Sequence, residues 1–327
     1  MVEIRAPVVV ESWGSFAHAS KYPSLFTKLI VAYNRLSTPS ERAFWKVWVS
    51  ALAFSIKMEN LVIDKPKPGV AVVWLNRPNK LNAVSFKMFD EIKGAFETLG
   101  KDRDVRVIVL AGKGKAFTAG IDLNDFQSLG QNMGPDPARI AINAYSKIKD
   151  LQNSVNAIED CGKPVIAAVS GYCLGAGVDI VSACDIRYAC KDSVFSIKEV
   201  FIGLTADLGT LQRLPKVVKS DSWVRELAYT GRDFGVQEAM QQGLVSRSFE
   251  SSSELMEASL QLAETIAEKS PVAILGCKRS LVHGRDHSVK EGMEFIANWN
   301  SWATQAPDLV EAIVSRLQKK KPNFPKL

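Results

Sequence analysis

The stretch SGYCLGAGVDIVSACDIRYA, residues 170–189, decides what kind of fold this chain adopts. It follows the apolar run KPVIAAV, which indicates a short buried β-strand. Its middle part, rich in glycine and alanine, is typical of a turn that opens a helix, and SACDIRYAC then predicts another strand. Strand, small-residue turn, helix and strand in close succession are typical of an α/β fold.

The same alternation continues on the N-terminal side of this stretch. Residues 60–78, NLVIDKPKPGVAVVWLNRP, predict two short strands joined by a Pro/Gly turn. Residues 82–102 have the apolar spacing of an amphipathic helix, and VRVIVLAG at 105–112 predicts a buried strand. A further helix is expected over residues 152–161. Strands and helices therefore alternate through about residue 215.

From Ser220 onward the pattern becomes helical. Helices are expected within residues 236–245, 253–270, 271–284 and 288–303. We therefore predict three parts: an N-terminal extension over 1–57 that could serve for targeting, a core with the active site over 58–219, and a C-terminal helical region over 220–327.

Composition and charge exclude several classes of protein. The 327 residues are 46% hydrophobic and 23% charged, as in soluble globular proteins. No run reaches the roughly 18 apolar residues expected of a membrane-spanning helix. The net charge is +6, but residues 1–57 carry +4 of it, so the other 270 residues are nearly neutral. A nucleic-acid-binding face is therefore not expected.

Cysteine, histidine and glycine patterns exclude other chemistries. The five cysteines form no C-x-x-C pair, and the only histidines are His18, His283 and His287. A zinc site is therefore not expected, and the cysteines are interpreted as reduced thiols of an intracellular protein. Neither G-x-G-x-x-G nor G-x-x-x-x-G-K-[ST] occurs, which disfavours dinucleotide binding and nucleotide hydrolysis.

Three acids stand in unusually apolar surroundings. Residues 198–215, KEVFIGLTADLGTLQRLP, contain Glu199 and Asp207, and Asp179 lies in the helix that follows the LGAG turn. Burying an ionised carboxylate is costly unless the group has a partner or a task. One interpretation is that each acid caps a helix or pairs with Lys198 or Arg213. The other is that the acids meet in one pocket and move protons next to a carbonyl group.

A second small-residue turn, KAFTAGIDL at residues 115–123, also follows a buried strand. Backbone N–H groups at such turns and at helix N-termini are unpaired, so two facing turns can hold one oxygen as it gains negative charge. The alternative is that these glycines only permit close packing of helix and strand.

Four motifs together resemble the crotonase (enoyl-CoA hydratase/isomerase) superfamily: LNRPNKLNAVS, KAFTAGIDL, GYCLGAGVDIVSACDIRYA and KEVFIGLTADLGTLQRLP. The resemblance runs from about Asn60 to Phe324. It implies a spiral of ββα units followed by a helical region that builds trimers, usually paired into hexamers, and a CoA thioester as substrate. Within the superfamily, hydratases have Glu where this chain has Asp179. Asp207 is the mark of the dienoyl-CoA isomerases.

The resemblance also implies a set of site residues. Asp179, Glu199 and Asp207 match catalytic acids, the last two as the pair that moves a proton between C2 and C6, with their roles as base and acid left open. The N–H groups of Ile121 and Ala176 match the oxyanion hole, although most members have glycine at the latter position. Expected substrate-binding residues are Ala83, Thr118, Ala119, Gly120, Asp122 and Gly175.

The activity implied is isomerisation of 3,5-dienoyl-CoA to 2,4-dienoyl-CoA in fatty acid β-oxidation. It requires neither a metal nor a redox cofactor, since CoA is part of the substrate. Residues 77–83 resemble the adenine-side wall of the family, and Lys320 and Lys321 are candidates for contact with CoA phosphates. The alternatives are an enoyl-CoA hydratase and a non-catalytic crotonase-fold binding protein, such as the RNA-binding relatives.

Two features bear on location. Residues 1–57 are basic and rich in Ser and Thr, as in a mitochondrial transit peptide, although Glu3 and Glu11 are atypical of one. The last residues, PKL, resemble the peroxisomal S-K-L signal, with proline in place of the small residue. We therefore expect the mitochondrial matrix, with the peroxisome as the alternative.

Overall fold

The computed structural model describes residues 58–128 and 133–327. The predicted N-terminal extension over residues 1–57 lies outside the described residues. Glu59–Leu327 form one compact unit, and all that follows concerns that unit.

Six strands form the larger sheet. In spatial order they are β1 (Leu61–Lys67), β2 (Gly69–Leu75), β3 (Val105–Gly112), β5 (Val165–Val169), β7 (Ile186–Cys190) and β10 (Arg247–Phe249). β1 and β2 are antiparallel, and every other neighbouring pair is parallel. All five residues of β5 are buried, as expected of a parallel strand covered on both faces.

Four short strands form a second sheet. In spatial order they are β4 (Ala116–Thr118), β6 (Tyr172–Leu174), β8 (Val194–Ser196) and β9 (Phe234–Gly235). β3, β5 and β7 of the larger sheet are each followed along the chain by β4, β6 and β8 of the smaller one. Because the same two-strand step repeats in parallel register, with helices between the steps, the predicted spiral of ββα units is confirmed.

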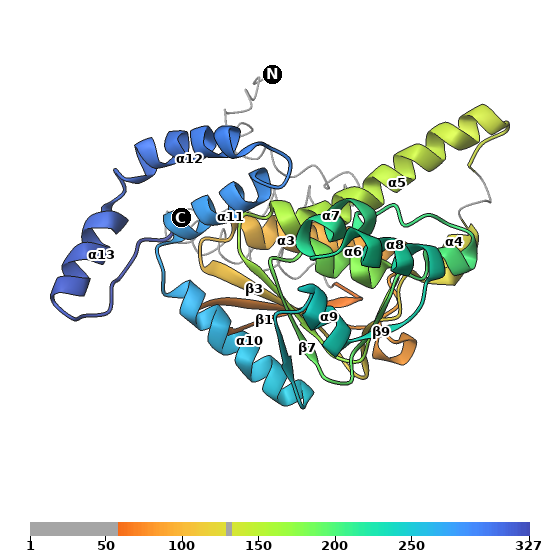
Figure 1. The fold of residues 1–327 in the computed structure, drawn as a ribbon, viewed down its shortest axis with the longest axis horizontal. Coiled ribbons are helices and arrows are strands. Elements are labelled where there is room, and N and C mark those ends of the chain that lie inside the picture. Colours follow the sequence, from red (N-terminus) through yellow and green to blue (C-terminus); the bar gives the residue numbers. More distant parts are fainter. Residues whose placement is uncertain (1–57, 129–132) are drawn as a thin grey trace, which may run out of the picture. The chain divides into compact units, whose positions relative to one another are not determined.

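Helices pack on both faces of the larger sheet (Figure 1). Those on the first face include α3 (Phe86–Lys101), α5 (Pro137–Asp160), α6 (Ala176–Ala183) and α7 (Thr210–Val217). The second face is covered by α10 (Ser252–Ala267), whose buried residues Leu255, Ala263 and Ala267 pack in one cluster with valines of β2 and β3. These residues recur at intervals of four or eight, so they form a single stripe along the helix.

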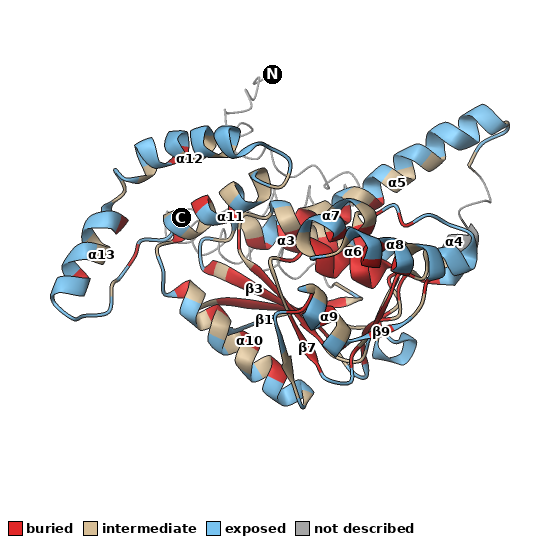
Figure 2. Ribbon diagram, viewed as in Figure 1, coloured by how far each residue is buried: buried red, intermediate tan, exposed pale blue. Residues whose placement is uncertain are grey.

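The other helical elements are shorter or lie nearer the C-terminus. They are η3 (Pro78–Lys80), α4 (Leu123–Ser128), η4 (Glu199–Ile202), α8 (Asp221–Thr230), α9 (Val236–Gln242), α11 (Pro271–His283), α12 (Val289–Ala303) and α13 (Pro307–Leu317). Figure 2 shows that α6 is buried, whereas α12, α13 and the first half of α5 are largely exposed.

The region after Ser220 contains the expected helices and also takes part in both sheets. β9 joins the smaller sheet beside β8, and β10 joins the larger one beside β7. The C-terminal segment is also attached to the larger sheet, because Arg106 of β3 donates hydrogen bonds to the carbonyl oxygens of Ala267 and Phe324, both at 2.8 Å. The division at residues 219 and 220 stays a prediction.

Within the described residues, none of the helices combines the length and the apolar character needed to cross a bilayer.

Candidate active site

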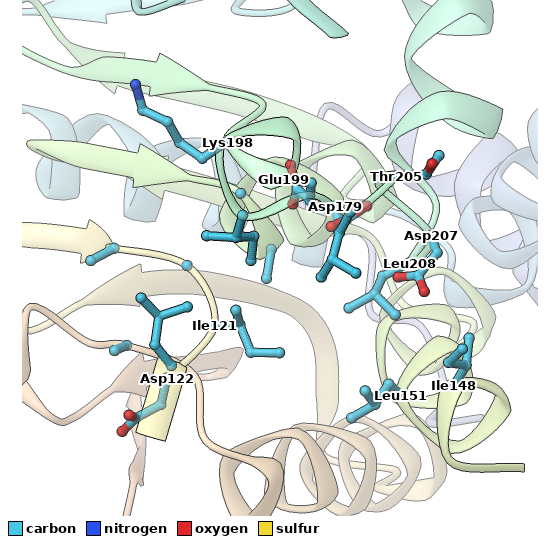
Figure 3. A pocket seen from close by; sticks show the side chains of 18 of the residues that line it. Ile121, Asp122, Ile148, Leu151, Asp179, Lys198, Glu199, Thr205, Asp207 and Leu208 are labelled. Carbon is cyan, nitrogen blue, oxygen red and sulfur yellow. The ribbon is translucent and has the colours of Figure 1, made fainter. Parts of the chain in front are cut away.

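A pocket of about 850 Å³ lies between the turn after β4, the start of α6, the segment from η4 to α7, and α5. Much of its wall is apolar, with Ile148 and Leu151 contributed by α5 and Leu208 by the segment before α7. Figure 3 shows these side chains together with the three acids predicted from the sequence. The described structure therefore brings Asp179, Glu199 and Asp207 to one cavity.

One rim of the pocket is the turn that opens α6. Gly175 has φ +50°, which an L side chain rarely adopts, and a Cβ atom there would lie 3.1 Å from Oε1 of Glu199. Ala176 is the first residue of the helix, so its N–H group has no carbonyl one turn earlier to bond. Among the described residues, the structure gives this N–H no acceptor.

The facing rim is the turn after β4. Gly120 has φ +93°, and a Cβ atom there would lie 2.9 Å from the carbonyl oxygen of Leu174. Val84 bridges this turn by donating to the Gly120 carbonyl at 2.7 Å and accepting from Asp122 N–H at 3.0 Å. This pattern leaves the N–H of Ile121 without an acceptor within residues 58–128 and 133–327. Two unpaired N–H groups thus line one pocket from adjacent turns.

Asp179 projects from α6 and is 1% exposed. Its Oδ1 accepts a hydrogen bond of 2.7 Å from the backbone N–H of Thr210 at the start of α7. Burial raises the pKa of Asp179 to about 6, and hydrogen bonding by Thr210 opposes the rise. At neutral pH this carboxyl is therefore mainly ionised.

Glu199 is the first residue of η4, and its carboxyl lies against the backbone of Gly175. Its Oε2 is buried and has no hydrogen-bond partner among the described residues. Burial, with the charge of Asp179 as a second cause, raises the pKa of Glu199 to about 7. Glu199 can therefore both take up and release a proton near neutral pH.

Asp207 lies in the segment between η4 and α7 and is the most exposed of the three acids. Its backbone carbonyl accepts a hydrogen bond of 2.7 Å from Nε2 of Gln152 on α5, which fixes the segment at this point. Partial burial raises the pKa of its carboxyl above the ordinary value.

The ion-pair interpretation of these acids does not fit the geometry. Lys198 pairs with Asp233 at 2.6 Å, and Arg213 pairs with Glu159 at 2.6 Å. In the part of the chain that the structure describes, none of the three acids forms a salt bridge.

The other predicted site residues divide into two groups. Ala83, Ala119, Gly120, Asp122 and Gly175 line the pocket. Thr118 does not. It is fully buried beneath the turn, where its hydroxyl donates to the Asn82 carbonyl and accepts from the Gly120 N–H. Its position indicates a supporting role rather than contact with a substrate.

Asp122 lines the pocket but is engaged in an ion pair. Its Oδ2 lies 2.9 Å from Arg77 and 3.6 Å from Lys80. Burial alone would raise the pKa of Asp122, but hydrogen bonds from Arg77 and the Asn124 backbone, with the charge of Lys80, lower it overall. Arg77 also donates to the Ala83 carbonyl. By holding Arg77 in place, Asp122 therefore helps to fix the wall formed by residues 77–83.

Sequence reasoning missed the apolar wall of the pocket. The pocket is also lined by Ile148, Leu151, Phe201, Ile202 and Leu204. Apolar residues of these types occur in any hydrophobic core, so the sequence alone does not identify them as pocket residues. The lysine-rich tail lies apart from this wall. Lys320 and Lys321 do not line the pocket of their own chain, and Lys321 pairs with Glu268 at 2.6 Å.

Among the described residues, no cluster of three or more His, Cys, Asp or Glu side chains is arranged to hold a metal ion.

Comparison with known proteins agrees with this geometry. The sequence profile described as Enoyl-CoA hydratase/isomerase matches residues 65–326. The mitochondrial delta(3,5)-delta(2,4)-dienoyl-CoA isomerase of Homo sapiens is 46% identical over 263 residues, which are 80% of each chain. The peroxisomal enzyme of that name from Arabidopsis thaliana is also 46% identical, over 77% of this chain and 91% of its own.

A solved structure shows the same fold. The enoyl-CoA hydratase of Bacillus anthracis superposes with a TM-score of 0.74 at 26% identity, covering 82% of this chain and 99% of that one. Together with the match to most of the chain, this confirms the resemblance predicted from the four motifs. The chain belongs to the enoyl-CoA hydratase/isomerase family, the crotonase superfamily.

Proposed function

We propose that this protein isomerises 3,5-dienoyl-CoA to 2,4-dienoyl-CoA in fatty acid β-oxidation. The observation that carries the proposal is the set of three carboxyls with raised pKa values around one apolar pocket, beside two unpaired backbone N–H groups. The relatives named dienoyl-CoA isomerase, at 46% identity over most of the chain, support the same substrate class.

In the proposed mechanism the thioester oxygen accepts hydrogen bonds from the N–H groups of Ile121 and Ala176. Glu199 lies against Gly175, next to this oxyanion site, so it is the acid placed to reach C2. It takes the C2 proton, and the bonding electrons form a trienolate whose charge rests on the held oxygen. Asp207, farther along the apolar wall, gives a proton to C6, and the two double bonds become conjugated with the thioester carbonyl.

Asp179 is proposed to act on Glu199 by its charge rather than by proton transfer. It already accepts the Thr210 N–H, and its charge contributes to the raised pKa of Glu199. A base with a pKa near neutrality is strong enough to attack the acidified C2–H and is still ionised in part at the working pH.

The substrate and cofactor proposals follow from this chemistry. Only protons and double bonds move, so the reaction has no electron to pass to a redox group, and CoA enters as part of the acyl-CoA substrate. Apolar side chains such as Ile148 and Leu151 are suited to a fatty acyl chain.

We propose further that the protein self-associates as a trimer or hexamer through its C-terminal helices. α13 exposes a group of large apolar side chains, among them Val310, Ile313 and Leu317. Such a group is typical of a surface that another chain covers. The mitochondrial matrix is the proposed location and the peroxisome the alternative, in keeping with the names of the relatives.

An enoyl-CoA hydratase is the second candidate, because solved structures of the same fold carry that name. A hydratase needs two carboxylates that hold one water molecule. Asp179 is one methylene shorter than the Glu of the hydratases, is almost fully buried and already accepts the Thr210 N–H. This arrangement disfavours water addition.

The test uses ultraviolet absorbance with two substrates. Purified full-length protein is mixed with a 3,5-dienoyl-CoA or with a 2-enoyl-CoA. We expect growth of the conjugated 2,4-dienoyl signal from the first and little loss of the enoyl signal from the second. The reverse pattern would show that the protein is a hydratase and that Asp207 does not give a proton to C6.

A further inference from the structure

Asp207 borders a second cavity that the proposed mechanism does not use. This cavity measures about 520 Å³, lies between α5, the start of α7 and the segment after α11, and shares Asp207 and Leu208 with the acyl pocket. The two other acids line only the acyl pocket. Asp207 is therefore the one member of the triad with access to two separate spaces.

The walls of the second cavity are polar, in contrast to those of the acyl pocket. Its lining includes Gln152, Asn156, Glu159, Asp160, Gln212, Arg213 and Arg285. Glu159 accepts from both Arg213 and Arg285 at 2.6 Å, so the charges are largely balanced and fixed in place. A roomy polar cavity holds water, whereas an apolar one of the same size stays dry.

The surroundings of Glu199 are different. Its Oε2 is buried and unpaired within the described residues, and its carboxyl faces only the acyl pocket. An acyl chain seated in that pocket would remove the water near Glu199. Asp207 would keep contact with water on its other side.

We infer that the polar cavity is the route by which Asp207 exchanges its proton with bulk water while the acyl group fills the pocket. The inference rests on the proposed isomerase function. Glu199, without such a route, keeps its proton until the ligand leaves. The two acids of the pair therefore differ in solvent exchange as well as in position.

The exchange has a defined chemical course. Ionised Asp207 takes a proton from C6 of bound 2,4-dienoyl-CoA, and the C–H electrons enter the trienolate. In D2O the new carboxylic acid exchanges its proton for a deuteron with cavity water, which leaves as HOD. The deuteron returns to C6 with the same electron pair. The net change is one C6–H replaced by one C6–D, without isomerisation.

The experiment separates the two acids by variants that each retain one of them. Glu199→Gln is incubated with 2,4-dienoyl-CoA in D2O, and Asp207→Asn with 3,5-dienoyl-CoA in D2O. Deuterium in the recovered ligands is located by NMR. We expect deuterium at C6 in the first sample and retention of protium at C2 in the second. Equal exchange in both samples, or exchange at C2 alone, would overturn the inference.

A variant of the cavity itself provides a second measurement. Gln212 lines the polar cavity and not the acyl pocket. Adding Gln212→Trp to the Glu199→Gln protein should lower the rate of C6 exchange, and adding Gln212→Ala should not. Unchanged exchange with the tryptophan present would exclude this cavity as the route.

Controls distinguish failure of the inference from failure of the proposed function. Binding of the CoA ester and circular dichroism establish that each variant is folded. The wild-type protein is assayed for isomerisation in the same D2O buffer. No isomerisation by the wild type would contradict the proposed function, whereas isomerisation without selective C6 exchange would contradict only the proton route.

Discussion

At the scale of single residues, the three acids hold different positions around one pocket. Asp179 is buried and tied to the Thr210 N–H, Glu199 is enclosed with one unpaired oxygen, and Asp207 is the most exposed of the three. Burial raises all three pKa values, to about 6 for Asp179 and about 7 for Glu199. One acid can therefore be ionised while its neighbour is protonated, as proton transfer at two carbons requires.

Replacing Asp207 by Asn is expected to abolish most of the isomerase turnover. Asn keeps the size and polarity of the side chain but cannot give a proton to C6, and losing a positioned general acid costs about 100-fold or more in kcat. Binding of the CoA ester should be retained, because the pocket walls are unchanged. Steady-state kinetics and calorimetric titration check this. Unchanged turnover would show that Asp207 has no part in the chemistry.

Replacing Glu199 by Gln is expected to stabilise the fold at alkaline pH. Its pKa of about 7 in the folded chain exceeds the unfolded value, so the stability associated with the neutral carboxyl is present at acidic pH and is lost as pH rises through about 7. Gln cannot ionise. It should raise the free energy of unfolding by about 2 kcal/mol near pH 8 and by much less near pH 5. Urea unfolding at both pH values measures this, and an equal gain at the two would contradict it.

Ionisation of Glu199 should also make the activity depend on pH, in the direction opposite to that of stability. If Glu199 is the base at C2, kcat/KM rises as pH increases through about 7, because only its ionised form removes a proton. In Asp179→Asn the rise should move to lower pH, since the charge of Asp179 is one cause of the raised pKa of Glu199. A pH–rate profile of both proteins checks this, and a rise that stays in place would argue against charge coupling.

At the scale of elements, the site depends on a clamp between α5 and α7. Arg213 of α7 donates to Glu159 and to Asn156 of α5, each at 2.6 Å, and its guanidinium packs against Gly209. Gly209 lies between Asp207 and Thr210, the residue that binds Asp179. The clamp therefore holds the segment that places two of the three acids.

Arg213→Met is expected to lower both stability and turnover. Methionine keeps much of the apolar stem and leaves Glu159 paired with Arg285, so the loss should be about 2 kcal/mol rather than the full cost of an orphaned charge. Displacement of Asp207 should reduce kcat by about tenfold or more, with a smaller change in KM. Arg225→Met, which breaks the exposed pair with Asp221 on α8, is the matched control and should cost under about 0.5 kcal/mol. Equal effects of the two changes would show that the clamp has no special role.

How far the elements can be predicted depends on their length. β3 and α3 carry long apolar patterns, and the sequence predicts them over nearly the residues that form them. β4, β6 and β8 have three residues each, too few to show a period. For α5 the sequence predicts only 152–161, because the first half of the helix is exposed and lacks an apolar stripe. Which face of α5 meets the pocket depends on packing between distant segments, so Ile148 and Leu151 could not be identified from the sequence.

At the scale of the whole molecule, the exposed apolar side chains of α12 and α13 support the proposed self-association. Val310 and Ile313 are 64% and 52% exposed, which is unusual for such residues on adjacent turns of one helix. Their burial by another chain would remove this surface from water.

The double change Val310→Glu and Ile313→Glu is expected to reduce the assembly to single chains of 35.9 kDa. Two charges on the covered surface would have to be desolvated without partners, which costs several kcal/mol. Light scattering coupled to gel filtration measures the mass. Lys290→Glu on α12 changes charge without adding to the apolar surface and serves as the control. A wild-type protein that already runs as a single chain would contradict the proposed assembly.

The position of α10 in the chain also determines when the fold can be completed on the ribosome. The strands that it covers, β2, β3, β5 and β7, are all synthesised before residue 191, whereas α10 ends at Ala267. During the intervening elongation the face that includes Val107, Val109 and Ile166 is not yet covered by α10. Nascent chains of intermediate length therefore present an apolar sheet face, which chaperones recognise, and termination before α10 yields a substrate for proteolysis rather than a smaller enzyme.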